Sequence, residues 1–212
     1  MFCFETDFFL HLAAFLVYFT MFIYLASKGV ENNQRKRMLL IALAFSFASI
    51  ERAIAHNSCV SEKMLVQTEN YLKPFWILVT PLCLLVVIGL TKFEKTADSL
   101  LTNIAVAVYV LTGSILLWKG SLITYSRVDF GWLINNNGQP AGRIFHFIDM
   151  LMTYMALPFI IYAFINGRDR VRRMQAAVVS ISAFLAVIGL LICQIFFKNS
   201  FLADSADLVC LL

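Results

Sequence analysis

Long apolar stretches separated by short polar segments dominate the chain. Six of them approach the roughly 20 predominantly apolar residues that a helix needs to cross about 30 Å of hydrocarbon. They run from Phe8 to Ser27, Met38 to His56, Pro74 to Thr91, Thr102 to Trp118, Ile144 to Ile165 and Met174 to Phe197. This pattern predicts an all-α, polytopic transmembrane helix bundle of six spans, with the last residues available for a partial seventh. No connecting segment is long enough for a soluble domain, so residues 1–212 are expected to form a single transmembrane helical domain.

Lysine and arginine gather in alternate loops between these stretches. Ten of the 17 basic residues lie in the first, third and fifth loops: Lys28, Arg35, Lys36, Arg37, Lys92, Lys95, Arg168, Arg170, Arg172 and Arg173. Cytoplasmic loops carry the basic excess in membrane proteins. We therefore expect these loops in the cytoplasm and the amino terminus outside, in a bacterial inner (plasma) membrane. The net charge of +4 is then a topology signal, and the expected partners are the lipid bilayer and other membrane subunits or a second copy, not nucleic acid.

The composition supports a membrane protein, with 60% hydrophobic and 14% charged residues, where soluble domains average about a quarter charged. We expect the first span to be retained and not to be a signal peptide, because it has no basic leader and no small-residue cleavage pattern. Among the five cysteines, Cys3 and Cys59 fall on the same outer side. An oxidising exterior would permit a disulfide between them.

Ionisable side chains inside the spans are few, and they carry most of the functional information because such groups are costly at membrane depth. Glu51 lies about one turn from the outer end of the second span, and Asp149 about one turn into the fifth. His11, His56 and His146 each lie near the outer end of a different span. The predicted topology brings all five side chains to the same side of the membrane.

These residues predict an outward-facing polar pocket for a metal, a haem, a proton or a small ligand, because histidine is the commonest metal ligand and titrates near neutral pH. His146, Asp149 and Thr153 share one helical face. The pocket candidates are Asp149, His146, Glu51, Thr153, His11 and His56, and the metal-ligand candidates are His11, His56 and His146. In the alternative interpretation the histidines are interfacial residues wetted by water and headgroups, and Asp149 makes a structural hydrogen bond to a neighbouring helix.

No cofactor and no enzymatic activity are predicted. A b-type haem needs two facing histidines from different helices, which His11 and His146 could in principle supply, and nothing else in the sequence supports it. Neither HxxxH nor HExxH occurs, which disfavours a zinc hydrolase.

Small residues at positions 42, 46, 49 and 53 form a stripe that favours close helix packing. Pro81 and Pro158 lie inside spans, where proline kinks a helix.

Several scattered segments fall in the order expected of a microbial rhodopsin. Residues 24–29 end the first span, residues 76–82 read Trp-Ile-Leu-Val-Thr-Pro-Leu, and residues 202–204 read Leu-Ala-Asp. In these segments the chain resembles this family of heptahelical membrane proteins. The place of the family's retinal-binding lysine holds Leu208, however, and the counterion carboxylate is matched by Phe75. We expect no lysine at mid-membrane depth. Without such a lysine a retinal Schiff base is excluded, so the resemblance does not imply light-driven pumping.

A second, more general comparison is with the multi-helix membrane input domains of bacterial sensor kinases and cyclases, which implies that a separate partner carries the signal. Three functions remain open from the sequence. The first is a non-catalytic receptor- or sensor-like bundle or a membrane subunit of a larger complex. The second is a channel or transporter for protons, ions or a small solute, lined by Glu51, Asp149 and Gln194. The third is a haem- or metal-binding redox subunit.

Overall fold

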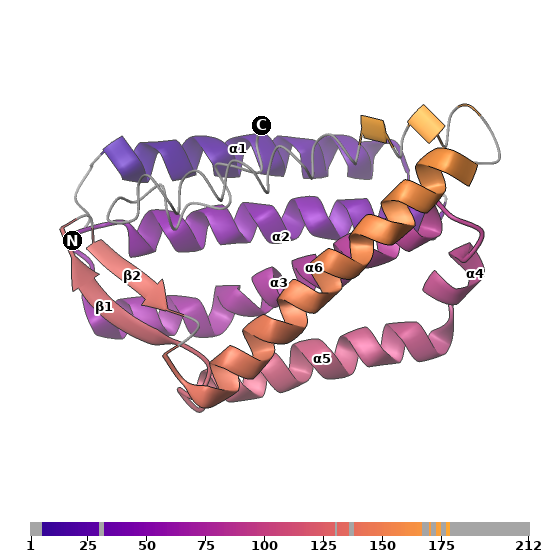
Figure 1. The fold of residues 1–212 in the computed structure, drawn as a ribbon. Coiled ribbons are helices and arrows are strands. Elements are labelled where there is room, and N and C mark those ends of the chain that lie inside the picture. Colours follow the sequence, from indigo (N-terminus) through magenta and orange to yellow (C-terminus); the bar gives the residue numbers. More distant parts are fainter. Residues whose placement is uncertain are drawn as a thin grey trace.

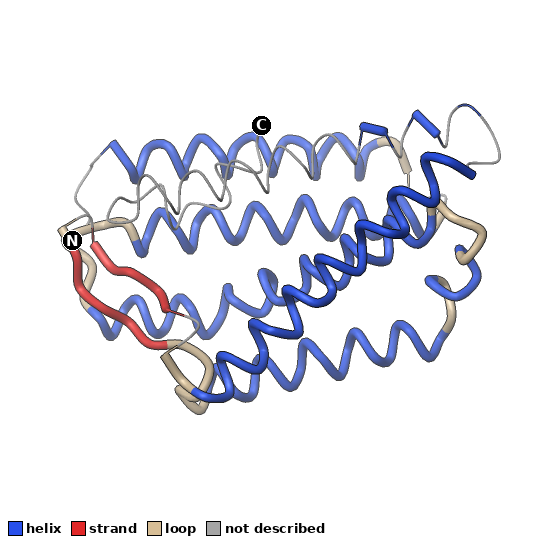
Figure 2. Tube along the Cα trace, in the orientation of Figure 1, coloured by secondary structure: helices blue, strands red, loops and turns tan. Residues whose placement is uncertain are grey.

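The computed structural model describes residues 6–29, 32–129, 131–135 and 138–166, together with positions 170, 173, 174, 177 and 178 (Figure 1). Helices make up most of this part of the chain, and the two strands lie together at one end (Figure 2). The elements in chain order are α1 (Thr6–Ser27), α2 (Asn33–Ala55), α3 (Glu62–Gly89), α4 (Glu94–Ala97), α5 (Leu100–Trp118), β1 (Thr124–Val128), β2 (Gly131–Asn135) and α6 (Pro140–Asn166).

Five helices within the described residues, α1, α2, α3, α5 and α6, are long and apolar enough to cross a membrane. The shortest has 19 residues and the longest 28, which correspond to about 28 and 42 Å at 1.5 Å per residue. The predicted all-α membrane architecture is therefore confirmed at this level. The predicted sixth span, Met174 to Phe197, and the partial seventh lie outside the described residues, apart from positions 174, 177 and 178.

The long helices run antiparallel in chain order. α1 packs against α2, α2 against α3, and α3 against both α5 and α6, while α6 crosses the others obliquely (Figure 1). The starts of α1, α3 and α6 and the ends of α2 and α5 share one end of the bundle with the two strands, and we call it the hairpin end. The predicted basic loops before α2 and after α3 lie at the opposite end (Figure 1).

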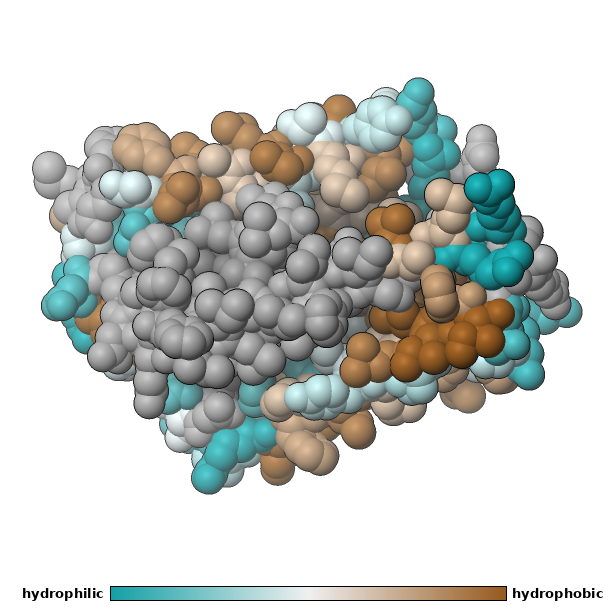
Figure 3. Space-filling view, turned by 45° about the horizontal axis from the view of Figure 1, so that its top comes forward, coloured by the Kyte–Doolittle hydropathy of each residue, from teal (hydrophilic) through white to brown (hydrophobic). Residues whose placement is uncertain are grey.

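The bundle buries several polar side chains beside its apolar core and exposes many large apolar side chains. The small-residue stripe of α2, residues 42, 46, 49 and 53, is buried between α1 and α3. Large apolar side chains on α1, α5 and α6 are exposed instead, among them Leu16, Leu101, Leu111, Phe147 and Phe164. Hydrophilic atoms gather toward the two ends of the bundle (Figure 3). This distribution suits a molecule whose sides face lipid and whose ends face water.

All five long helices begin earlier than the predicted spans, three of them by four residues or more. α2 begins at Asn33, because the Asn32 side chain accepts a hydrogen bond from the Arg35 amide at 2.9 Å. α3 begins at Glu62, twelve residues before the predicted start at Pro74, after Ser61 caps it in the same way. α6 begins at Pro140, a residue favoured in the first turn of helices. As a result Asp149 lies nine residues into α6, deeper than the predicted single turn.

The connection between α5 and α6 forms an antiparallel β-hairpin, which the hydrophobic pattern did not predict. Thr124 pairs with Asn135 and Val128 with Gly131. The predicted turn at residues 135–138 is described only at its two ends. Trp132 Nε1 donates to the Val60 carbonyl at 2.9 Å, so the hairpin is bonded to the loop between α2 and α3.

Cys59, in the loop between α2 and α3, is disulfide-bonded, whereas Cys83 on α3 carries a thiol. The predicted partner, Cys3, lies outside the described residues. We expect peptide mapping by mass spectrometry without reduction to recover the Cys3 and Cys59 peptides as one species that separates on reduction. Cys83 should be alkylated without reduction. A linkage of Cys59 to Cys193 or Cys210 would contradict the predicted pairing.

Candidate functional site

Three charged side chains meet between α2 and α3 near the hairpin end. The Lys73 ammonium donates to Glu51 Oε1 at 3.1 Å and lies 3.6 Å from Glu69 Oε2. All three residues are at most 2% exposed. Arg52 adds a second positive charge, with its Nε 4.0 Å from Glu51 Oε1. Buried charges are tolerated when they are paired, so Lys73 holds the two carboxylates together. We call Glu51, Glu69 and Lys73 the ion cluster.

The start of α3 changes the position of one lysine. Lys73 precedes the predicted span, but α3 starts at Glu62, so Lys73 lies eleven residues into this helix. At 1.5 Å per residue this is about 16 Å from the start of the helix, just before its apolar stretch. The expected absence of a lysine at mid-membrane depth, and with it the exclusion of a retinal Schiff base, remains a prediction.

Three oxygen atoms of the ion cluster accept no hydrogen bond from a nitrogen or hydroxyl donor of the described residues, although the Glu51 and Glu69 carboxyl groups lie within hydrogen-bonding reach of each other. They are Glu51 Oε2 and both oxygens of Glu69. An unsatisfied buried acceptor costs about 1–3 kcal/mol and more when it is charged. A polar molecule that donated hydrogen bonds at this place would therefore be stabilised.

Tyr125 of β1 lies near enough to the ion cluster for its carboxylates to act on the phenol. Burial raises the pKa of the Tyr125 phenol, and the nearby Glu69 and Glu51 carboxylates raise this pKa further. The phenol thus stays neutral and protonated throughout the physiological range.

A second polar contact joins α5 to α6. The Tyr109 hydroxyl donates to Asp149 Oδ1 at 2.5 Å, and the Tyr109 ring stacks on Phe145 with centroids 4.4 Å apart. No basic side chain in the described ranges forms an ion pair with Asp149. The carboxylate is therefore held by a neutral donor. This bond agrees with the alternative interpretation, in which Asp149 makes a structural hydrogen bond to a neighbouring helix.

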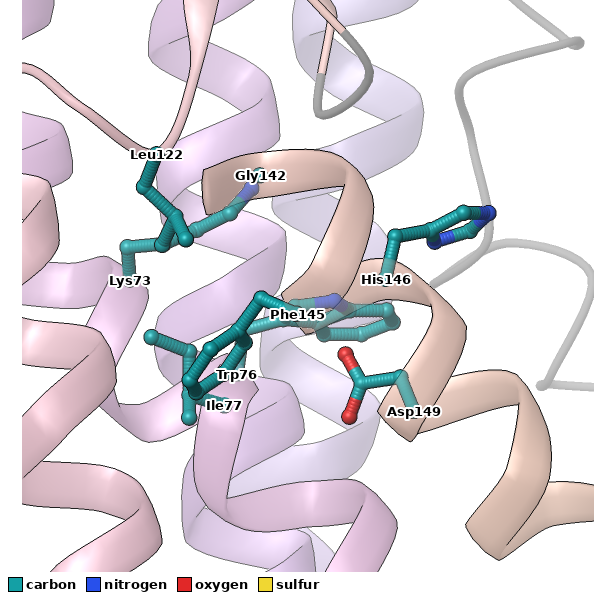
Figure 4. Close-up of a pocket in the computed structure, with 8 residues that line it drawn as sticks. All are labelled: Lys73, Trp76, Ile77, Leu122, Gly142, Phe145, His146 and Asp149. Atoms are coloured by element: carbon teal, nitrogen blue, oxygen red, sulfur yellow. The ribbon is translucent and has the colours of Figure 1, made fainter. Parts of the chain in front are cut away.

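A small cavity lies between the ion cluster and Asp149. Its lining residues are Lys73, Trp76, Ile77, Leu122, Gly142, Phe145, His146 and Asp149 (Figure 4). Its volume is about 30 Å³, on a scale where one water needs at least about 10–15 Å³. About two water molecules would fill it. The lining joins one cation, one carboxylate and aromatic rings from α3 and α6.

Two other predicted members of the pocket lie less centrally. The His146 ring points away from the Asp149 carboxylate (Figure 4). Thr153 is exposed, and its hydroxyl donates to the backbone carbonyl of Asp149 at 2.9 Å. Thr153 is not part of the cavity lining. Of the three residues predicted to share one face of this helix, His146 and Asp149 line the cavity and Thr153 does not.

The predicted histidines meet in a different pairing from the one considered for haem. His11 Nε2 and His56 Nδ1 are 2.9 Å apart, and both rings are completely buried between α1 and α2. His146 lies on α6, beside the cavity. In this structure His11 contacts His56 and not His146, and a haem held between His11 and His146 stays a prediction. Among the described residues no group of three or more His, Cys, Asp or Glu side chains is placed to hold a metal ion.

The sequence reasoning missed Lys73, Glu69 and Tyr109 as members of the site. The signal for the first two was the spacing of four between them, which puts both on one face of a helix. The hydropathy pattern predicts a helix that starts only at Pro74, so the spacing of Glu69 and Lys73 on one helix was not recognised. Tyr109 carried no signal, since a tyrosine in an apolar span is ordinary. Comparisons of the chain with protein-family models, curated proteins and solved structures found no match.

Proposed function

We propose that the chain is a receptor-like integral membrane protein that binds a small polar solute in the cavity between Lys73 and Asp149, alone or as a membrane subunit of a larger complex. The observation that carries the proposal is the cavity itself, where opposite charges from α3 and α6 face a space of about 30 Å³. Polar groups facing a small space inside an apolar bundle are typical of ligand sites. Neighbouring side chains hold Lys73 and Asp149 in fixed positions. Fixed charges of this kind suit the binding of a solute without a chemical reaction.

The orientation is part of the proposal. The hairpin end faces the outside of the plasma membrane, and the basic loops at the opposite end face the cytoplasm. Two observations support this orientation: the positive-inside rule and the disulfide at Cys59, which suits an oxidising compartment. At the opposite end, the buried Arg37 donates to the Ala97 carbonyl at 2.7 Å and to Asp98 at 2.8 Å. This contact ties α2 to the end of α4.

The test is the unfolding temperature of the purified protein in lipid nanodiscs with a panel of small solutes. The panel contains ammonium, formate and formamide, which are a cation, an anion and a neutral solute of at most three non-hydrogen atoms. A ligand that binds only the folded state raises this temperature. We expect at least one solute to raise it saturably, and Leu122→Phe, which fills the cavity, to abolish the rise. Leu111→Phe on the exposed side of α5 is the matched control. If no solute acts on the wild type, the proposal is wrong.

A carrier for protons, ions or a small solute is the second candidate. It is favoured by the ionisable residues that α2, α3 and α6 contribute inside membrane-length helices, because such residues often mark ion paths. Pro81 and Pro158 also interrupt the backbone of α3 and α6. Loss of proton or cation flux in liposomes with Asp149→Asn, but not with Thr153→Val, would support it. Full flux in both Asp149→Asn and Glu51→Gln would rule out this route.

Relationship to the microbial rhodopsins stays a prediction. Trp76, which carried part of that resemblance, is a wall of the cavity. A chromophore the length of retinal exceeds a space for about two water molecules, so we propose a solute-binding role in its place. The redox alternative likewise stays a prediction, with His11 and His56 as the residues to replace.

A further inference from the structure

The two charges that line the cavity differ in how they are compensated. Lys73 is paired with both Glu51 and Glu69, at 3.1 and 3.6 Å. Asp149 receives a hydrogen bond from the neutral Tyr109 hydroxyl, and no described basic residue forms an ion pair with it. Asp149 is therefore the charged group of the cavity lining that lacks a direct ion pair among the described residues. In an apolar surrounding such a charge favours a positively charged ligand.

The size of the cavity limits that cation. A volume of about 30 Å³ accepts about two water-sized groups. Ammonium and methylammonium fit this space, whereas choline and larger quaternary amines exceed it. An anion or a zwitterion would need Lys73 as a partner, but that ammonium is already held by two carboxylates.

The walls of the cavity favour an ammonium ion over a metal ion. Asp149 is the only described lining residue whose side chain carries oxygen, while hard metal cations require several oxygen ligands. Trp76 and Phe145 supply aromatic rings instead. The faces of such rings attract ammonium groups within about 6 Å.

We propose that the cavity binds a small monovalent ammonium ion, ammonium itself or methylammonium, with Asp149 as the counter-ion and Trp76 and Phe145 as its aromatic walls. This inference rests on the proposed function, because it names the solute class for the same cavity. In the complex, the N–H groups of the ligand donate to Asp149, and its charge balances the carboxylate.

The test is the unfolding temperature in nanodiscs during titration with ammonium chloride or methylammonium chloride, at an ionic strength held constant with sodium chloride. We expect a saturable rise for the wild type. In Asp149→Asn we expect the apparent Kd to weaken about tenfold or more, because a charge-assisted hydrogen bond is lost. The amide of Asn can still accept from Tyr109, so the variant should fold. Thr153→Val, one turn away and outside the cavity, should bind like the wild type.

The outcomes separate this inference from the proposed function. A response of the wild type to methylammonium but not to choline, reduced in Asp149→Asn, supports both. If formate or formamide raises the unfolding temperature and Leu122→Phe abolishes the effect, while ammonium salts do nothing, the cavity is a binding site but the cation assignment is wrong. If Asp149→Asn binds ammonium like the wild type, the assignment of the counter-ion is overturned. If no solute binds, both proposals fail.

Discussion

Replacing Lys73 by methionine is expected to lower the free energy of unfolding by about 3–5 kcal/mol. Methionine keeps the length of the side chain but removes the ammonium that pairs with Glu51 and Glu69. The two carboxylates then remain buried beside each other without the cation between them. The measurement is the unfolding of the purified protein in detergent micelles, followed by the loss of helical circular dichroism as denaturant is added.

Lys63→Met is the matched control for this prediction. Lys63 lies on the same helix but is exposed, so its replacement should change the free energy of unfolding by no more than about 0.5 kcal/mol. A triple variant that combines Lys73→Met with Glu51→Gln and Glu69→Gln should recover part of the loss, because it also removes the uncompensated carboxylates. Equal stability of Lys73→Met and Lys63→Met would show that the ion cluster does not hold α2 and α3 together.

Replacing Gly131 by alanine is expected to separate the hairpin from the end of α2, at a cost of about 1–3 kcal/mol. Gly131 has φ +122°, and an added Cβ would lie 2.4 Å from the Ala55 carbonyl oxygen and 2.9 Å from the Asn57 amide nitrogen. Both contacts are with backbone atoms, which cannot turn aside as a flexible side chain can. Faster hydrogen–deuterium exchange of the backbone amides in β1 and β2 would report the separation.

Gly120→Ala controls for the backbone strain alone. Gly120 also has a positive φ of +65°, but an added Cβ would meet no atom within 4 Å. Its replacement should cost about 1–2 kcal/mol and leave the exchange of the hairpin amides unchanged. If Gly131→Ala left exchange as slow as in the wild type, the close approach of the hairpin to α2 would not exist in solution.

The position of α3 shows why part of the site escaped prediction. The segment before Pro74 has a low hydropathy because it contains Glu62, Glu69 and Lys73. Hydropathy therefore predicts a loop for this segment. The structure shows a helix that continues through Pro74. Lys73 and Glu69 are buried in it because Glu51 of α2 lies opposite. A hydropathy profile evaluates each residue alone, so it does not show that a partner from another helix offsets the cost of burying a charge.

The histidines and Asp149 show the same limit. Their placement toward the hairpin end follows from the antiparallel order of the helices, and the sequence predicts it. The choice of partner does not follow from the sequence. His11 contacts His56 and not His146 because α1 packs against α2, and Asp149 contacts Tyr109 because α6 lies beside α5.

The sequence by itself determined the class of the molecule and most of its membrane-length helices. It also predicted that the basic loops lie at the end opposite the histidines, and that Glu51 and Asp149 belong to the site. These properties depend on the free energy of transfer of local segments from water to hydrocarbon, which each segment carries with it. Only the tertiary structure decided the ion cluster, the bond of Tyr109 to Asp149, the pairing of His11 with His56 and the docking of the hairpin. Each of these contacts joins segments distant in the chain, and their geometry depends on which helices pack together.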